Sequence, residues 1–355
     1  MLLLVRRHDR RSSSKKGADH IADTTPSGSC SRPKFLIIAA GLLIGGCSGP
    51  QSALDPGAEG AAELASLFWF MLAAAGVIWT IVIGVAIYAV RANPKPDEGQ
   101  RGSRLVIYLG VIFPVVALGV LLTYGLTLMP DLRSPGDGLT IAVTGEQWWW
   151  RVEYRSPELD APVVSANEIR MPVGQRTEFI LESADVIHSF WIPPLGGKMD
   201  MTPGHVTRLV LEPTETGTYR GVCAEFCGTS HALMAFSVIV MEEEAFARWL
   251  AEEAAPADPP ATPVAERGAT LFAQVGCGAC HTVRGTAADG VVGPDLTHLA
   301  SRAMLGGGIL PNDPETLAEW ISDTEALKPG VLMPSFGMLP EDDLDAIVAY
   351  LEGLE

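Results

Sequence analysis

The segment CAEFCGTSHALM, residues 223–234, places two cysteines, a histidine and a methionine within one short loop. Thiolate, imidazole and thioether groups together form a ligand set that suits copper. A second histidine, His188 in DVIHSFWIP, stands on a separate upstream segment, so the fold would have to bring it to the loop. Spacing alone leaves three interpretations open: a copper site, a tetrahedral zinc site of both cysteines and both histidines, and a Cys223–Cys227 disulfide.

The region around this loop has the pattern of an all-β domain. Between residues 139 and 241, short runs rich in β-branched and aromatic residues are separated by Gly, Pro and Asp turns: LTIAVTG, WWWRVEY, TEFILES, TRLVLEP, GTYRGVC and AFSVIVM. Several short strands at such spacing are typical of a sandwich or a barrel. We therefore predict an all-β domain over 139–241.

Two long apolar stretches precede the β-rich region, at about 64–90 and 105–128, and neither contains a charged residue. Each is long enough to cross ~30 Å of hydrocarbon as a helix. The short loop between them carries Arg91, Lys95, Arg101 and Arg104. Because positive loops stay in the cytoplasm, we predict a two-helix transmembrane hairpin within 48–133, with everything after it outside.

The N-terminal 47 residues read as a secretory signal. A polar, basic stretch is followed by the apolar run FLIIAAGLLIGG and then Cys47. A positive region, a short apolar region and small residues make up such a signal. The end of this stretch, LIGGC, resembles a bacterial lipobox, which would make Cys47 a lipidated mature N-terminus.

The C-terminal region, 264–355, contains CGACH at 277–281 within otherwise helical patterns. In this motif two thiols add to the vinyl groups of haem c, and the adjacent histidine, His281, ligates the iron. A thioredoxin-like motif or half of a zinc site fits poorly, because no βαβ pattern and no further cysteine pair lie nearby. A predicted helix and a Pro/Ala-rich linker, 242–263, join this all-α domain to the β domain.

Charge is distributed unevenly along the 355 residues. The net charge is −17, and the segment 241–355, with 20 acidic and 5 basic residues, contributes −15 of it. This distribution argues against a nucleic-acid partner, which needs a basic face. It suits a basic protein partner attracted over long range.

From about residue 63 to 241 the chain resembles subunit II of cytochrome c oxidase, whose copper loop reads C-x-E-x-C-x-x-x-H-x-x-M. This resemblance implies a cupredoxin-like Greek-key domain with a binuclear copper (CuA) centre, in which both cysteines bridge two copper ions and each histidine binds one. The ligands would be Cys223, Cys227, His188, His231, Met234 and the carbonyl of Glu225. The side chain of Glu225 would also help to bind a magnesium ion at the contact with subunit I, with Asp200 as a weaker candidate.

The aromatic run EQWWWRVEY resembles the family motif G-H-Q-W-x-W, with Glu146 in place of the usual histidine. Trp148 aligns with the tryptophan through which electrons enter. In a strand Trp148 and Trp150 would share one face, and we expect Trp149 and Trp150 to be packing residues. The family often has a glutamate at the mouth of a proton channel near the start of the second membrane helix. None stands between 105 and 114, so the resemblance does not extend to this proton entry.

The C-terminal region resembles class I cytochrome c, through VGPDLTHL and MPSFG around the CGACH motif. The resemblance implies Met333 as the distal iron ligand and the carbonyl of Pro294 as the acceptor of a hydrogen bond from His281. Met304 and Met338 are competing ligands outside the M-P-x-F context. His298 is expected to be a surface or packing residue.

A subunit II fused to such a domain is the hallmark of the caa-type oxidases. The combined resemblance implies a component of a proton-translocating terminal oxidase in the bacterial inner membrane, together with subunit I and other subunits. Electrons from a soluble or membrane-bound cytochrome c would pass through the haem and the copper pair to subunit I. A copper chaperone or storage lipoprotein is a rival reading. Nitrous oxide reductase is another, but it needs a His-rich propeller and this chain has 7 histidines.

Overall fold

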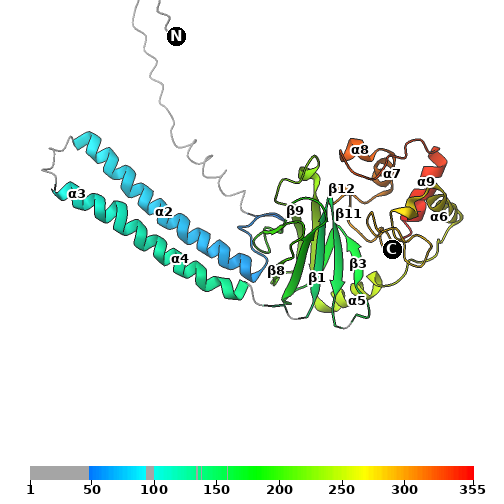
Figure 1. The fold of residues 1–355 in the computed structure, drawn as a ribbon, viewed down its shortest axis with the longest axis horizontal. Coiled ribbons are helices and arrows are strands. Elements are labelled where there is room, and N and C mark those ends of the chain that lie inside the picture. Colours follow the sequence, from blue (N-terminus) through cyan, green and yellow to red (C-terminus); the bar gives the residue numbers. More distant parts are fainter. Residues whose placement is uncertain (1–47, 93–99, 133–134, 137, 158) are drawn as a thin grey trace, which may run out of the picture. The chain divides into compact units, whose positions relative to one another are not determined.

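The computed structural model describes residues 48–92, 100–132, 135–136, 138–157 and 159–355 (Figure 1). The predicted signal segment with Cys47, and Lys95 of the predicted cytoplasmic loop, lie outside the described residues.

Two long apolar helical segments open the described chain. Helix α2 spans Glu59–Ala92; the second segment consists of α3 (Gln100–Ile107), a π-helical turn (Tyr108–Ile112) and α4 (Phe113–Leu132). Both segments are long and apolar enough to cross a membrane, and their most apolar windows are not buried by the rest of the chain. The two apolar helices expected from the sequence are thus present, each extending a few residues beyond the predicted limits.

The β-rich region forms a sandwich of two five-stranded sheets, with strand orders β3-β2-β1-β5-β8 and β4-β10-β9-β6-β7. The strands of the first sheet are β1 (Thr140–Glu146), β2 (Trp149–Arg155), β3 (Val163–Ala166), β5 (Thr177–Ser183) and β8 (Thr207–Leu211). Those of the second are β4 (Glu168–Pro172), β6 (His188–Trp191), β7 (Met199–Met201), β9 (Gly217–Cys223) and β10 (Ala235–Met241). Buried and partly exposed residues alternate along β1 and β2, as strands with one face on a core require.

Aromatic side chains fill the space between the two sheets. Phe190 stacks on Phe236 with ring centroids 4.8 Å apart, and Trp150 meets Phe236 edge-on at 5.1 Å. All three side chains are almost fully buried. This rigid core supports the ends of β6 and β9, where the predicted metal ligands begin.

Helix α5 (Glu243–Glu253) follows β10 and leads to a helical domain made by residues 263–355. Its elements are α6 (Pro263–Val275), a 3-10 turn (Cys277–Ala279), β11 (Met304–Leu305), β12 (Leu310–Pro311), α7 (Pro314–Ser322), α8 (Thr324–Leu327) and α9 (Glu341–Leu351). Side chains of Thr262 and Asp313 cap α6 and α7, and each helix begins with a proline. The predicted helical character is confirmed, with the two-residue strands β11 and β12 as a small addition.

Helix α6 crosses α9 at very close range because Gly268 has no side chain. A Cβ atom placed on Gly268 would lie 1.8 Å from the carbonyl oxygen of Ala346. One turn along α6, Phe272 packs edge-on against Tyr350 of α9, with ring centroids 5.5 Å apart. The crossing positions the start of the CGACH segment directly after α6.

Candidate metal and haem sites

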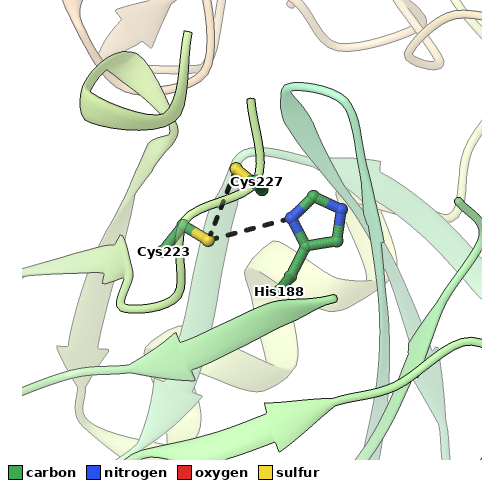
Figure 2. A group of neighbouring side chains, drawn as sticks. All are labelled: His188, Cys223 and Cys227. Carbon is green, nitrogen blue, oxygen red and sulfur yellow. Dashed lines mark hydrogen bonds between the residues drawn. The ribbon is translucent and has the colours of Figure 1, made fainter. Parts of the chain in front are cut away.

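The two cysteines and His188 form one buried cluster at an end of the β-sandwich (Figure 2). His188 opens β6, Cys223 closes β9, and the antiparallel pairing of these strands brings them together. The Sγ atom of Cys223 lies 3.7 Å from Nδ1 of His188 and 3.7 Å from Sγ of Cys227. The fold thus brings in the upstream histidine that the loop spacing alone could not place.

The other predicted ligands surround the same two sulfur atoms. Sγ of Cys227 is 3.5 Å from Nδ1 of His231 and 3.8 Å from Sδ of Met234, while Sγ of Cys223 is 3.2 Å from the carbonyl of Glu225. Two donors on one tetrahedral ion, bound at ~2.0–2.3 Å, are separated by about this much. A sulfur–sulfur distance of 3.7 Å is far beyond a disulfide bond of ~2.05 Å.

The grouping offers more donors than a single tetrahedral zinc ion uses. His188 lies beside the sulfur of Cys223 and His231 lies beside that of Cys227, with the two sulfurs adjacent to each other. Met234 and the Glu225 carbonyl add two donors that a four-ligand zinc site does not use. Met234 is only 1% exposed and its Sδ lies 3.8 Å from Sγ of Cys227, so its thioether belongs to the cluster and is shielded from solvent.

Asp185 and Gln147, which the sequence analysis did not single out, hold the ligands in place together with Trp148. Oδ1 of Asp185 lies 2.8 Å from Nε2 of His188, so one ring nitrogen is fixed while Nδ1 faces the sulfurs. The carbonyl of Cys227 accepts hydrogen bonds from Nε2 of Gln147 (2.6 Å) and Nε1 of Trp148 (3.0 Å). The proximity of Asp185 to His188 in DVIH was a usable signal, whereas Gln147 became recognisable only from the fold.

Electrostatics within the cluster favour a thiolate at Cys223. A hydrogen bond from the Cys227 thiol lowers the pKa of Cys223, and a contact with His188 adds to the effect. Because the thiolate is the form of cysteine that binds a metal, this arrangement prepares the site for a cation.

Trp148 is buried, with 7% of its surface exposed, in the turn that precedes β2. Strand β2 begins at Trp149, so the alternation of faces along a strand covers Trp149 and Trp150 but not Trp148. The prediction that Trp148 and Trp150 share one face of a strand therefore fails, because Trp148 lies outside the strand. Trp150 is fully buried in the aromatic core, whereas the Arg151 guanidinium covers the Trp149 ring at 4.7 Å.

The candidate magnesium ligands Glu225 and Asp200 are both about half exposed. Nζ of Lys198 lies 2.7 Å from Asp200 and 4.0 Å from Glu225, so an ammonium group occupies the position between the two carboxylates. The hydrogen bond from Lys198 lowers the pKa of Asp200. By themselves these two residues do not form a magnesium site while Lys198 holds this place.

In the helical domain, the CGACH segment forms a 3-10 turn that brings Cys277 and Cys280 onto one short loop. Nδ1 of His281 lies 2.8 Å from the carbonyl of Pro294, the partner that the resemblance implied. Burial lowers the pKa of His281 and so favours the neutral ring that an iron ligand needs. A Cβ on Gly293 would lie 2.5 Å from this ring, so the glycine permits its position.

Of the three methionines considered as distal ligands, Met333 packs against the core of the helical domain and its carbonyl accepts a hydrogen bond from Thr324. Met338 is 75% exposed, and Met304 lies in β11. His298 is a buried packing residue whose ring nitrogens face the carbonyls of Glu355 and Ala255.

Arg302 is a further candidate that the sequence analysis missed. It is buried, and its Nε has no hydrogen-bond partner among the described residues. Its positive charge contributes to the lowered pKa of His281. Haem carries carboxylates, and an orphaned guanidinium donor beside the predicted iron ligand suits such a group. The residues of this domain therefore fit a haem.

A β-sandwich with a buried Cys/His/Met cluster, a helical domain with a haem c motif and two apolar helices together define a membrane-bound electron-transfer protein. Family models agree: "Cytochrome C oxidase subunit II, periplasmic domain" matches residues 159–242, and "Cytochrome c" matches 265–355. The chain belongs to the cytochrome c oxidase subunit II family and carries a C-terminal cytochrome c domain.

Individual relatives support this membership. Cytochrome c oxidase subunit 2 of Alkalihalophilus pseudofirmus is 32% identical over 88% of this chain and 94% of the relative. The Bacillus subtilis protein of the same name is 28% identical over 90% and 97%. Among solved structures, the periplasmic domain of subunit II from Bradyrhizobium japonicum is 32% identical, covering 34% of this chain and 95% of its own length with a TM-score of 0.31. The two family models and the two sequence relatives show that the chain is a component of cytochrome c oxidase, with copper and haem implied by its two domains.

Proposed function

We propose that this chain relays electrons from a donor cytochrome c to haem c, then to a binuclear copper centre, and onward to subunit I for oxygen reduction coupled to proton translocation. One observation carries the proposal: Trp148 is hydrogen-bonded both to the candidate copper loop and to the domain that holds the haem motif. Its ring Nε1 donates to the carbonyl of Cys227, while its own carbonyl accepts a hydrogen bond from Lys328 of the helical domain.

When bound, the haem and the copper pair each supply a one-electron redox couple. The roles of the protein are to hold ligands and to limit movement. Cys223 and Cys227 would bridge the coppers, with His188 and His231 as one terminal ligand each, and Met234 and the Glu225 carbonyl as weak ligands. Cys277 and Cys280 would hold the haem covalently between His281 and Met333. Asp185, Gln147 and Trp148 restrain the copper ligands, which suits a centre that must change little between oxidation states.

The two apolar helices support a location in a membrane. We place the hairpin in the bacterial inner membrane, with the β-sandwich and the helical domain on the periplasmic or extracellular side, where covalent haem attachment takes place. Subunit I and other oxidase subunits would contact the hairpin, and a magnesium ion near Glu225 would require a rearrangement of Lys198.

Metal and haem analysis of the purified chain tests the proposal. The wild type should contain two coppers and one covalent haem. Cys227→Ser should lose copper and keep haem, whereas Cys280→Ser should weaken haem attachment and keep both coppers, because the two sites use separate residues. One copper per chain, or tightly bound zinc in its place, would contradict the binuclear assignment.

A further inference from the structure

Lys328 is a lysine in an unusual position. It is only 1% exposed, and its Nζ donates to the carbonyls of Trp148 (2.7 Å) and Gly306 (2.5 Å). Lysine is almost never fully buried without a charged partner, yet no carboxylate pairs with it within the part of the chain that the structure describes. Burial accordingly lowers the pKa of Lys328 to about 7. The buried ammonium group of Lys328 thus joins two parts of the chain that are 180 residues apart.

The residues that follow Lys328 continue along the same surface of the β-sandwich. The carbonyl of Pro329 accepts a hydrogen bond of 2.6 Å from the hydroxyl of the buried Ser230, in the copper loop. Gly330 has φ +84°, and a Cβ there would lie 2.9 Å from the Trp148 ring. Val331 packs against the core of the sandwich. Residues 328–331 therefore contact Trp148, the copper loop and the core of the sandwich in succession.

A run of three glycines forms the second part of the contact. All three have positive φ, +61°, +79° and +78°, in the left-handed region that favours glycine: Gly306, Gly307 and Gly308. The carbonyl of Gly307 accepts a hydrogen bond from the amide of Ala235 at 3.0 Å, and that of Gly308 accepts one from Arg220 at 2.8 Å. A Cβ on Gly308 would lie 2.9 Å from the backbone of Ala235, so side chains here would separate the two surfaces.

Further hydrogen bonds flank this contact. Arg151 donates to the carbonyl of Val291 at 2.8 Å, and Glu146, which replaces the usual histidine of the family motif, holds Arg151 at 2.8 Å. On another side, Glu168 accepts a hydrogen bond of 3.0 Å from the amide of Ala303. Contacts on several sides fix both the orientation of the helical domain and its distance from the β-sandwich.

We propose that residues 306–308 and 328–331 form a docking element that fixes the helical domain of this chain against Trp148, with Lys328 as its positioning residue. The inference rests on the proposed electron relay and extends it: the two redox sites are held in one geometry, and the Pro/Ala-rich linker does not have to bring them together for each transfer. It also means that Trp148 is covered, so the donor cytochrome delivers its electron to the helical domain.

Lys328→Met, made in the full chain within the assembled oxidase, tests the docking element. Methionine keeps the length of the side chain and removes the donor. Amide exchange at Ala235, whose N–H is bonded to Gly307, should rise about tenfold or more. Transfer from haem to copper, followed by rapid mixing, should slow at least about tenfold, because the docked state that is competent for transfer would then be only a minor fraction of the population. Donor-to-haem transfer and the haem spectrum should be unchanged.

Arg208→Met is the matched control, because Arg208 is an exposed cation paired with Glu178 on the sandwich. Arg208→Met should leave amide exchange at Ala235, donor-to-haem transfer and haem-to-copper transfer at their wild-type values. If Lys328→Met leaves both Ala235 exchange and haem-to-copper transfer at the wild-type values, the docking element is overturned.

Two further outcomes are distinguishable. If Lys328→Met does not accumulate in cells, Gly307→Ala replaces it as the test variant. A Cβ on residue 307 would lie 2.6 Å from Nζ of Lys328, so this variant should also raise Ala235 exchange and slow haem-to-copper transfer. Wild-type values of both quantities in Gly307→Ala overturn the proposal. If the wild type transfers no electrons from haem to copper, the proposed function fails, and Ala235 exchange in the copper-free chain still decides whether Lys328 fixes the domain.

Discussion

At the scale of single residues, Cys227 shows how the candidate copper site is held. Its Sγ lies next to the sulfur of Cys223, the ring of His231 and the thioether of Met234. Its backbone carbonyl accepts hydrogen bonds from the side chains of Gln147 and Trp148. The same residue therefore joins the ligand cluster to the turn that carries Trp148. A ligand restrained from both its side chain and its backbone moves little when the metal changes charge.

The choice of distal haem ligand is a prediction at this scale. Met333→Ala should leave haem covalently attached, because Cys277 and Cys280 are untouched, but should change the iron spin state or lower the reduction potential. Absorption spectra and a redox titration measure both effects. Met338→Ala is the control, since Met338 is 75% exposed and should change neither. The opposite pattern would make Met338 the ligand.

At the scale of elements, local signals placed most helices and strands correctly. Asp313 and the proline after it begin α7 as the helix-start pattern indicated, and the β-rich runs became strands of the sandwich. The exception is the tryptophan run, where β2 begins one residue after Trp148. Its ring and backbone both bond to distant residues, Cys227 and Lys328, and these contacts hold it in a turn.

The crossing of α6 and α9 supports a stability prediction. Gly268→Ala should destabilise the helical domain by about 1–3 kcal/mol, because the added methyl group would overlap the carbonyl of Ala346 and force the helices apart. Denaturant unfolding followed by haem absorption measures the loss. Ala273→Leu, on the exposed side of the same helix, should cost much less. Equal stabilities would mean that the helices separate without penalty.

At the scale of the whole molecule, charge and docking act on different steps. The segment 241–355 carries −15 of the net charge and would attract a basic donor through solvent. At the centre of the contact between the helical domain and the sandwich, Lys328 and Ala235 instead form hydrogen bonds in buried positions beside Trp148. Mobile ions screen the first interaction and have little access to the second.

We therefore predict that salt separates the two transfer steps. Raising ionic strength to physiological levels, where the Debye length falls to ~8 Å, should slow donor-to-haem transfer. Haem-to-copper transfer should keep its rate. Rapid-mixing spectroscopy resolves them because haem and copper absorb at different wavelengths. A donor step independent of salt would show that the acidic surface does not steer the donor, and a salt-sensitive second step would contradict a buried docking contact.

The sequence by itself determined the features that depend on neighbouring residues. The spacing of Cys223 to Met234, the CGACH motif and the two apolar stretches are local patterns, and each led to the kind of element or site that its chemistry requires. Only the tertiary structure decided which distant groups join them. His188 meets the copper loop because β6 pairs with β9, Arg302 comes to His281, and Lys328 reaches Trp148 across 180 residues. Such contacts depend on the paths of whole strands and loops, and a linear pattern of residue types contains no record of those paths.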